Sequence, residues 1–121
     1  KAPTFYGLFY VDGKPKHIAL AFSLWLKMTS YPERLIINTS SGTSLWVLAG
    51  QNSIGEIALL LANPDDKTLK WGFNFADQRR TSYKMSLFQV NDVSEQIQTS
   101  AFNNHVLEIG ANTVQLLILK P

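Results

Sequence analysis

The segment from Asp12 to Met28 carries apolar residues on more than one side of a predicted helix. One stripe recurs at helical spacing and consists of Ile18, Ala21, Phe22, Trp25 and Met28. Leu20 and Leu24 extend a second strip beside it, and Leu26 lies on a further side. Because a small β domain buries one stripe of its helix, we interpret this helix as buried between two bodies. The alternative is a helix lying across a sheet with ordinary exposed leucines, since scattered exposed apolar residues are normal.

The ends of this helix carry their own signals. Asp12-Gly13-Lys14-Pro15 is a start signal, because a proline in the first helical turn lacks only an N–H that would be unpaired there. Pro32 stops the helix because it cannot continue the hydrogen-bond ladder.

The rest of the chain predicts short strands separated by turn residues. The expected strands are 34–38, 45–49, 56–62, 69–75, 83–91, 96–101, 105–109 and 113–120. In the fourth strand, Leu69, Trp71 and Phe73 alternate with polar residues or glycine, which is typical of a strand with one solvated face. This spacing predicts a mostly β fold: a two-sheet antiparallel β-sandwich of about eight strands with one N-terminal helix packed on it.

The second and third predicted strands, LWVLA and EIALLLA, are apolar on both faces. Such strands are usually covered on both sides. One face can meet the opposing sheet, and the other requires the helix or a neighbouring domain.

Composition limits the classes of function. The chain has 121 residues, 45% of them hydrophobic, which suits one domain with a proper core. A net charge of +2 with scattered basic residues argues against a nucleic-acid partner. No apolar run approaches the roughly 20 residues of a membrane span, so no membrane partner is expected. No signal peptide is visible, and the chain opens at Lys1 rather than Met, so we expect further sequence upstream. Localisation stays open.

No catalytic constellation is visible in the sequence. There is no cysteine, which removes thiolate catalysis and zinc–thiolate sites together. His17 and His105 lack metal-site spacing, and nothing ties together the glutamates Glu33, Glu56, Glu95 and Glu108. We therefore predict no catalytic residue, cofactor or metal in this chain.

The aromatic residues are the one feature suited to binding. Trp71 is in register with Phe73, which marks a core column. Trp46 is opposite in phase to Leu45 and Val47, so it faces the other way. A stacking platform for sugar rings is one interpretation. Packing against the helix or an absent partner is favoured, and the candidate contact residues are Ile18, Phe22, Trp25 and Trp46.

The opening FYGLFYVDGKPKHIALAFSLWLKM (5–28) resembles the end of the catalytic barrel in clan-A type glycoside hydrolases, most closely the family 39 β-xylosidases. Gly7, Leu8, Asp12, Gly13, Pro15, Lys16, Ala21 and Phe22 match the pattern "G-L-x-x-x-D-G-x-P-K" and its following helix. Downstream, LWVLAGQNSIGEIALLLANPDDKTLKW and ANTVQLLILKP resemble a hairpin and the final strand of the β-sandwich that follows such barrels. His17 and Ile18 stand where many relatives carry an aromatic pair, which leaves the family within the clan open.

The resemblance implies that residues 1–30 close a (β/α)8 barrel and residues 31–121 form a β-sandwich accessory domain. The catalytic glutamates of that clan would lie upstream of Lys1, so none is carried over to this chain. The implied partner is the upstream catalytic barrel of the same polypeptide, with self-association expected when the domain is isolated. Two other classes remain: a free-standing carbohydrate-binding module, and a protein–protein interaction domain.

Overall fold

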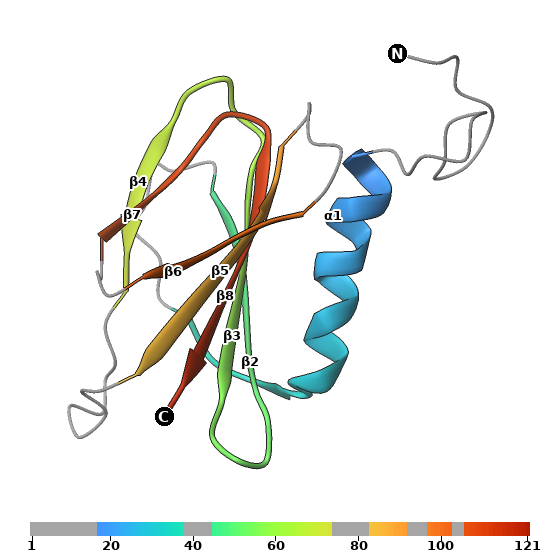
Figure 1. Cartoon of the computed structure of the whole chain (residues 1–121), viewed down its shortest axis with the longest axis vertical. Coiled ribbons are helices and arrows are strands. Elements are labelled where there is room, and N and C mark those ends of the chain that lie inside the picture. The colour runs from blue at the N-terminus through green and yellow to red at the C-terminus, as the bar shows by residue number, and fades with distance from the viewer. Residues whose placement is uncertain (1–16, 38–44, 74–82, 92–96, 103–105) are drawn as a thin grey trace.

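The computed structural model describes residues 17–37, 45–73, 83–91, 97–102 and 106–121 (Figure 1). Within these ranges it gives the backbone alone for residues 17, 18, 98–102 and 106. One α-helix, one 3-10 helix and eight strands follow in order: α1 His17–Leu26, η1 Lys27–Ser30, β1 Glu33–Arg34, β2 Trp46–Gln51, β3 Ile57–Asn63, β4 Leu69–Gly72, β5 Lys84–Val90, β6 Gln98–Phe102, β7 Val106–Ile109 and β8 Thr113–Lys120.

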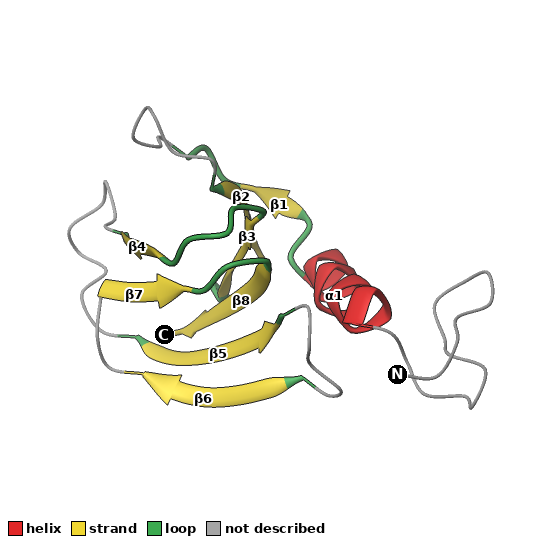
Figure 2. Cartoon of the chain, turned by 90° about the horizontal axis from the view of Figure 1, so that it is seen from above, coloured by secondary structure: helices red, strands yellow, loops and turns green. Residues whose placement is uncertain are grey.

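The strands form two antiparallel sheets. A six-stranded sheet has the order β1-β2-β3-β8-β5-β6, and β4 pairs with β7 in a second sheet of two strands. Helix α1 lies against one face of the large sheet, and the small sheet covers the other (Figures 1 and 2). The predicted fold class is confirmed: a mostly β, two-sheet antiparallel sandwich with one helix packed on it.

Strand register divides the core into two clusters. Leu60 of β3 pairs with Leu116 of β8, and both pack toward α1. Their neighbours Leu61 and Leu117 point to the opposite face, toward β4 and β7. Because successive side chains of a strand alternate between faces, a continuous apolar run fills both clusters. The prediction that the third strand is covered on both sides is confirmed for β3.

Polar contacts join the two sheets inside the sandwich. The indole Nε1 of Trp71 on β4 donates to Oε1 of Gln115 on β8 at 3.1 Å. The Gln115 Nε2 donates to the Glu108 carbonyl oxygen at 2.8 Å and to Gln89 Oε1 at 3.1 Å. Gln115 is buried, so these bonds offset the cost of removing its amide from water. The predicted core position of Trp71 is confirmed.

Several predicted boundaries are wrong. Of the strand expected at 34–38, the described residues up to 37 contribute only Arg34 to the ladder, as part of Glu33–Arg34. The Leu35 amide still donates to the Ala49 carbonyl oxygen of β2 at 3.1 Å, and Ile36 is exposed. The helical segment continues to Ser30 but changes to 3-10 geometry after Leu26. The start signal at 12–15 and the end of the fourth strand at Phe75 lie outside the described residues.

Candidate interaction surface on α1 and β2

The inner face of α1 packs on the large sheet. Leu24 and Met28 are 0% and 1% exposed. They belong to one cluster with buried residues of three strands: Ala58, Leu60, Val90, Leu116 and Ile118. Leu20 and Tyr31 join the same cluster from the two ends of the helical segment. This face is therefore filled by the chain's own sheet.

Three large apolar side chains lie on the rest of the helix. Phe22, Trp25 and Leu26, which we call the outer strip, are 45%, 46% and 45% exposed. The rings of Phe22 and Trp25 stack, with centroids 5.6 Å apart and planes at 29°. Spacings of three and four residues place side chains next to one another on a helix. The outer strip is thus a coherent surface rather than scattered exposure.

The sequence grouping of Met28 with Phe22 and Trp25 is wrong. Met28 lies four residues after Leu24, slightly more than one full turn, so both point at the sheet. Trp25 follows Leu24 by one residue and is rotated from it by roughly 100°. The helix indeed has two apolar sides, but the sheet covers the side built on Leu24.

Lys27 shows which way the outer strip is turned. Its Nζ lies 4.8 Å from the centre of the Phe88 ring on β5. Lys27 and Trp25 are rotated in opposite senses from the Leu24–Met28 line, given 3.6 residues per turn. Trp25 therefore lies on the flank of α1 turned away from β5, toward the half of the sheet that contains β3 and β2.

Trp46 is exposed on the same face of the sheet as α1. It pairs with Ala62, two residues from the Leu48–Leu60 pair, and Leu60 packs in the cluster under α1. Trp46 is 49% exposed. Three of the four predicted contact residues, Phe22, Trp25 and Trp46, are therefore exposed on one side of the molecule. The side chain of the fourth, Ile18, lies outside the described residues.

A close crossing fixes the end of the helical segment on β2. A Cβ atom at Gly50 would overlap the Tyr31 carbonyl oxygen and lie 3.0 Å from the Tyr31 Cβ. Arg34 Nη1 donates to that same carbonyl oxygen at 3.2 Å. Gly50 lies inside β2, where only glycine leaves room for the crossing chain. The sequence gives no sign of this contact, because it joins residues far apart in the chain.

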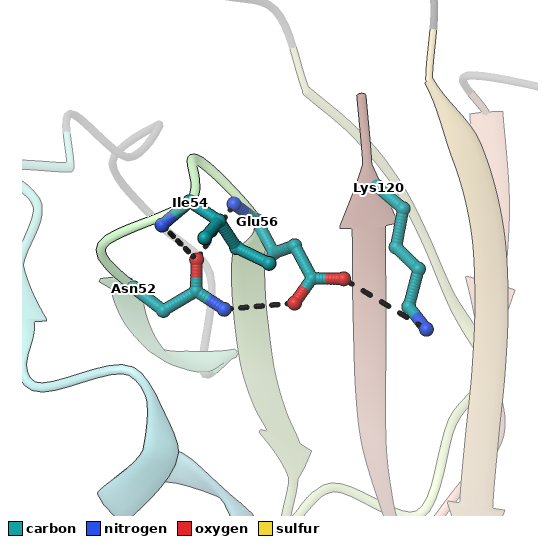
Figure 3. Close-up of polar contacts among 4 residues, drawn as sticks. All are labelled: Asn52, Ile54, Glu56 and Lys120. Carbon is teal, nitrogen blue, oxygen red and sulfur yellow. Dashed lines mark hydrogen bonds and ion pairs between the residues drawn. The ribbon is translucent and has the colours of Figure 1, made fainter.

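The hairpin between β2 and β3 carries a polar cluster built on Asn52 and Glu56 (Figure 3). Asn52 Oδ1 accepts from the amides of Ile54 at 3.2 Å and Glu56 at 2.9 Å, and its Nδ2 donates to Glu56 Oε1 at 2.8 Å. The other Glu56 oxygen lies 3.8 Å from Lys120 Nζ. The bonds of Asn52 close the turn that contains Gly55, and the bonds to Glu56 give that residue a structural role.

Glu56 also acts on Tyr31. Burial, and to a smaller degree the Glu56 charge, raises the pKa of Tyr31.

No group of three or more metal-ligating side chains occurs in the described ranges. Glu95 and His105 lie outside those ranges. Among the described residues, no helix has the length and apolar character that a membrane span requires. The exposed apolar surface of α1 and β2 is the feature suited to function.

Comparison by sequence finds neither a matching family model nor a matching curated protein. Comparison by structure does find relatives of the fold. The family 30 endoxylanase of Clostridium papyrosolvens C71 matches with a TM-score of 0.72 and 12% identity, over 93% of this chain and 30% of that chain. A family 30 subfamily 8 xylanase from Clostridium acetobutylicum gives 0.73 and 12%, over 95% and 31%. A family 86 β-porphyranase from Bacteroides plebeius gives 0.56 and 22%, over 72% and 16%.

These matches show a fold similar to part of two family 30 xylanases and do not single out family 39. The chain spans about a third of the length of the two family 30 xylanases that it matches. At such identities the likeness concerns the fold. The class defined by the structure is therefore a β-sandwich domain whose fold is similar to part of these glycoside hydrolases.

Proposed function

We propose that this chain is a non-catalytic C-terminal accessory domain of a glycoside hydrolase. It packs on the catalytic barrel of the same polypeptide, stabilises it and helps to shape the rim of its active site. Ile18, Phe22, Trp25 and Trp46 are the proposed contact residues. We call the longer polypeptide the parent chain; it is the proposed enzyme, and the barrel supplies both catalytic glutamates.

The observation that carries this proposal is the exposure of Phe22, Trp25 and Trp46 on the side of the large sheet that carries α1, although the described residues already form two buried clusters. Monomeric proteins rarely leave contiguous large apolar surfaces open to water. The match to only 30% and 31% of two xylanase chains supports the same view, because most of each xylanase lies outside the matched part.

The reading frame upstream of Lys1 provides the first test. We expect a barrel-sized extension with two glutamates at strand ends. The parent chain is then assayed on xylan, the substrate class named for the neighbouring enzymes, with and without residues 31–121. A large loss of thermal stability, together with a raised KM for xylan, is the expected result of truncation. A start codon or signal peptide close to Lys1 would contradict the proposal.

Glycan binding is a second candidate, and half-exposed Trp46 is the observation that favours it. Tryptophan combines a large flat apolar surface with one hydrogen-bond donor, which suits stacking on a sugar ring. Titration of the isolated chain with xylo-oligosaccharides tests this alternative. Trp46→Ala should abolish any binding that Trp25→Ala leaves unchanged.

A further inference from the structure

The position of α1 is fixed without any partner. Its inner residues Leu24 and Met28 are fully buried by the sheet. The chain that leaves the helical segment then crosses β2 at Gly50 so closely that a methyl group would not fit. Lys27 over the Phe88 ring holds one flank. Three separate contacts thus set the rotation of the helix about its own axis.

This rotation presents the outer strip in one orientation. Phe22 and Trp25 stack on each other, which restricts both rings, and Leu26 lies one turn from Phe22. The three side chains are uncharged, so the surface that they fit is apolar. A binding surface that is rigid before association loses less conformational entropy on binding than one that must first become ordered.

We propose that α1 is a preformed docking element: the sheet holds its inner face, and the outer strip binds an apolar surface of the catalytic barrel. This inference rests on the proposed function and adds two statements to it. The helix folds with the sandwich rather than with the barrel, and the centre of the interface is Phe22, Trp25 and Leu26. The barrel is the chosen occupant because the matched xylanases continue well beyond the part that this chain covers.

Radical footprinting of side chains tests the interface, with the isolated 121-residue chain compared with the parent chain. Trp25 and Phe22 should be oxidised at least tenfold more slowly in the parent. Ile54 is the matched control, because it is apolar, 72% exposed and on the β2–β3 hairpin rather than the helix. Its oxidation rate should be the same in both proteins.

Hydrogen exchange of the isolated chain tests the preformed helix. Amides of α1 from Ala21 to Leu26 should exchange at least a hundredfold more slowly than unstructured amides. Trp25→Ser and Ile54→Ser should leave this protection unchanged. In the full parent chain, only Trp25→Ser should lower the midpoint of thermal unfolding, by at least about 3 °C.

Each failure has a distinct meaning. Fast exchange in α1 would overturn the preformed helix. Equal oxidation of Trp25 in both proteins, in a parent that carries a barrel, would overturn the docking surface while the proposed function stands. Oxidation of Trp25 could instead slow as the concentration of the isolated chain rises and be no slower in the parent chain. That result would assign the outer strip to contact with a second copy and overturn the inference. A reading frame without a barrel would remove the proposed function itself.

Discussion

Leu24 and Trp25 are neighbours in the sequence and lie in opposite environments. Leu24 is completely buried against the sheet, and Trp25 is nearly half exposed on the outer strip. Both are large and apolar, so hydrophobicity alone does not distinguish a core position from an interface position. The direction in which each side chain leaves the helix, toward the sheet or away from it, makes this distinction. The inner face of α1 holds this domain together, and its outer strip is available to something else.

Leu24→Ala should have the largest effect. Removing a fully buried leucine leaves a cavity and costs about 2–5 kcal/mol of unfolding free energy. Leu26→Ala is the matched control, since it makes the same change on the same helix at an exposed position. That variant should lose under about 1 kcal/mol. Urea denaturation of both measures the difference; equal losses would mean that the two sides of α1 are not distinct.

Gly50→Ala should cost about 1–3 kcal/mol, because the added methyl group forces the Tyr31 backbone away from β2. This substitution sharpens the comparison between the inner face and the outer strip of α1, because it loosens the attachment of the helix without changing a side chain on either. Gly110→Ala is the control, since a Cβ there would lie 3.4 Å from Thr113 Oγ1, an ordinary contact. Thermal unfolding of both variants provides the measurement. A neutral Gly50→Ala would show that the crossing does not hold the helix.

Asn52→Ala should cost about 1 kcal/mol, because the amides of Ile54 and Glu56 lose their acceptor in a turn that is open to water. This hairpin lies outside both sides of α1, so protection of the α1 amides in hydrogen exchange should be unaffected. Ser53→Ala in the same turn should be within about 0.5 kcal/mol of the wild type. Faster hydrogen exchange of the α1 amides in Asn52→Ala would contradict the view that the β2–β3 hairpin and α1 are stabilised separately.

Tyr31 should produce the smallest effect, visible only at high pH. Its pKa is raised in the folded protein by burial first and by Glu56 second. Above the ordinary tyrosine pKa of about 10, the unfolded chain loses this proton while the folded chain keeps it, so stability falls as pH rises. Tyr31→Phe should reduce this loss of stability in the range from roughly pH 9 to pH 11. Identical pH profiles for the two proteins would contradict the assignment.

Local patterns predict much of this fold. The final strand has the predicted bounds, 113–120, because six of its eight residues are β-branched or leucine. The inward position of Trp71 follows from strict alternation with exposed neighbours. The phase of Trp46 against Val47 likewise predicts its face correctly, since its pairing with Ala62 puts it on the sheet face that carries α1.

Other features depend on contacts between distant residues, and no local pattern contains them. The helix periodicity reveals two apolar sides but not which one meets the sheet, because that choice is made by β3, β5 and β8. The strand position of Gly50 depends on Tyr31 crossing above it. The bonds of Gln115 to Trp71 and Gln89 require three strands from two sheets to meet.

The most direct test of the central claim is the unfolding free energy of Trp25→Ala, measured both in the isolated chain and in the parent chain. We predict a loss under about 1 kcal/mol in the isolated chain, where the ring is half exposed. In the parent chain the loss should reach about 3–5 kcal/mol, the value for a buried tryptophan. A large loss in the isolated chain, or an equally small loss in both, would contradict the account.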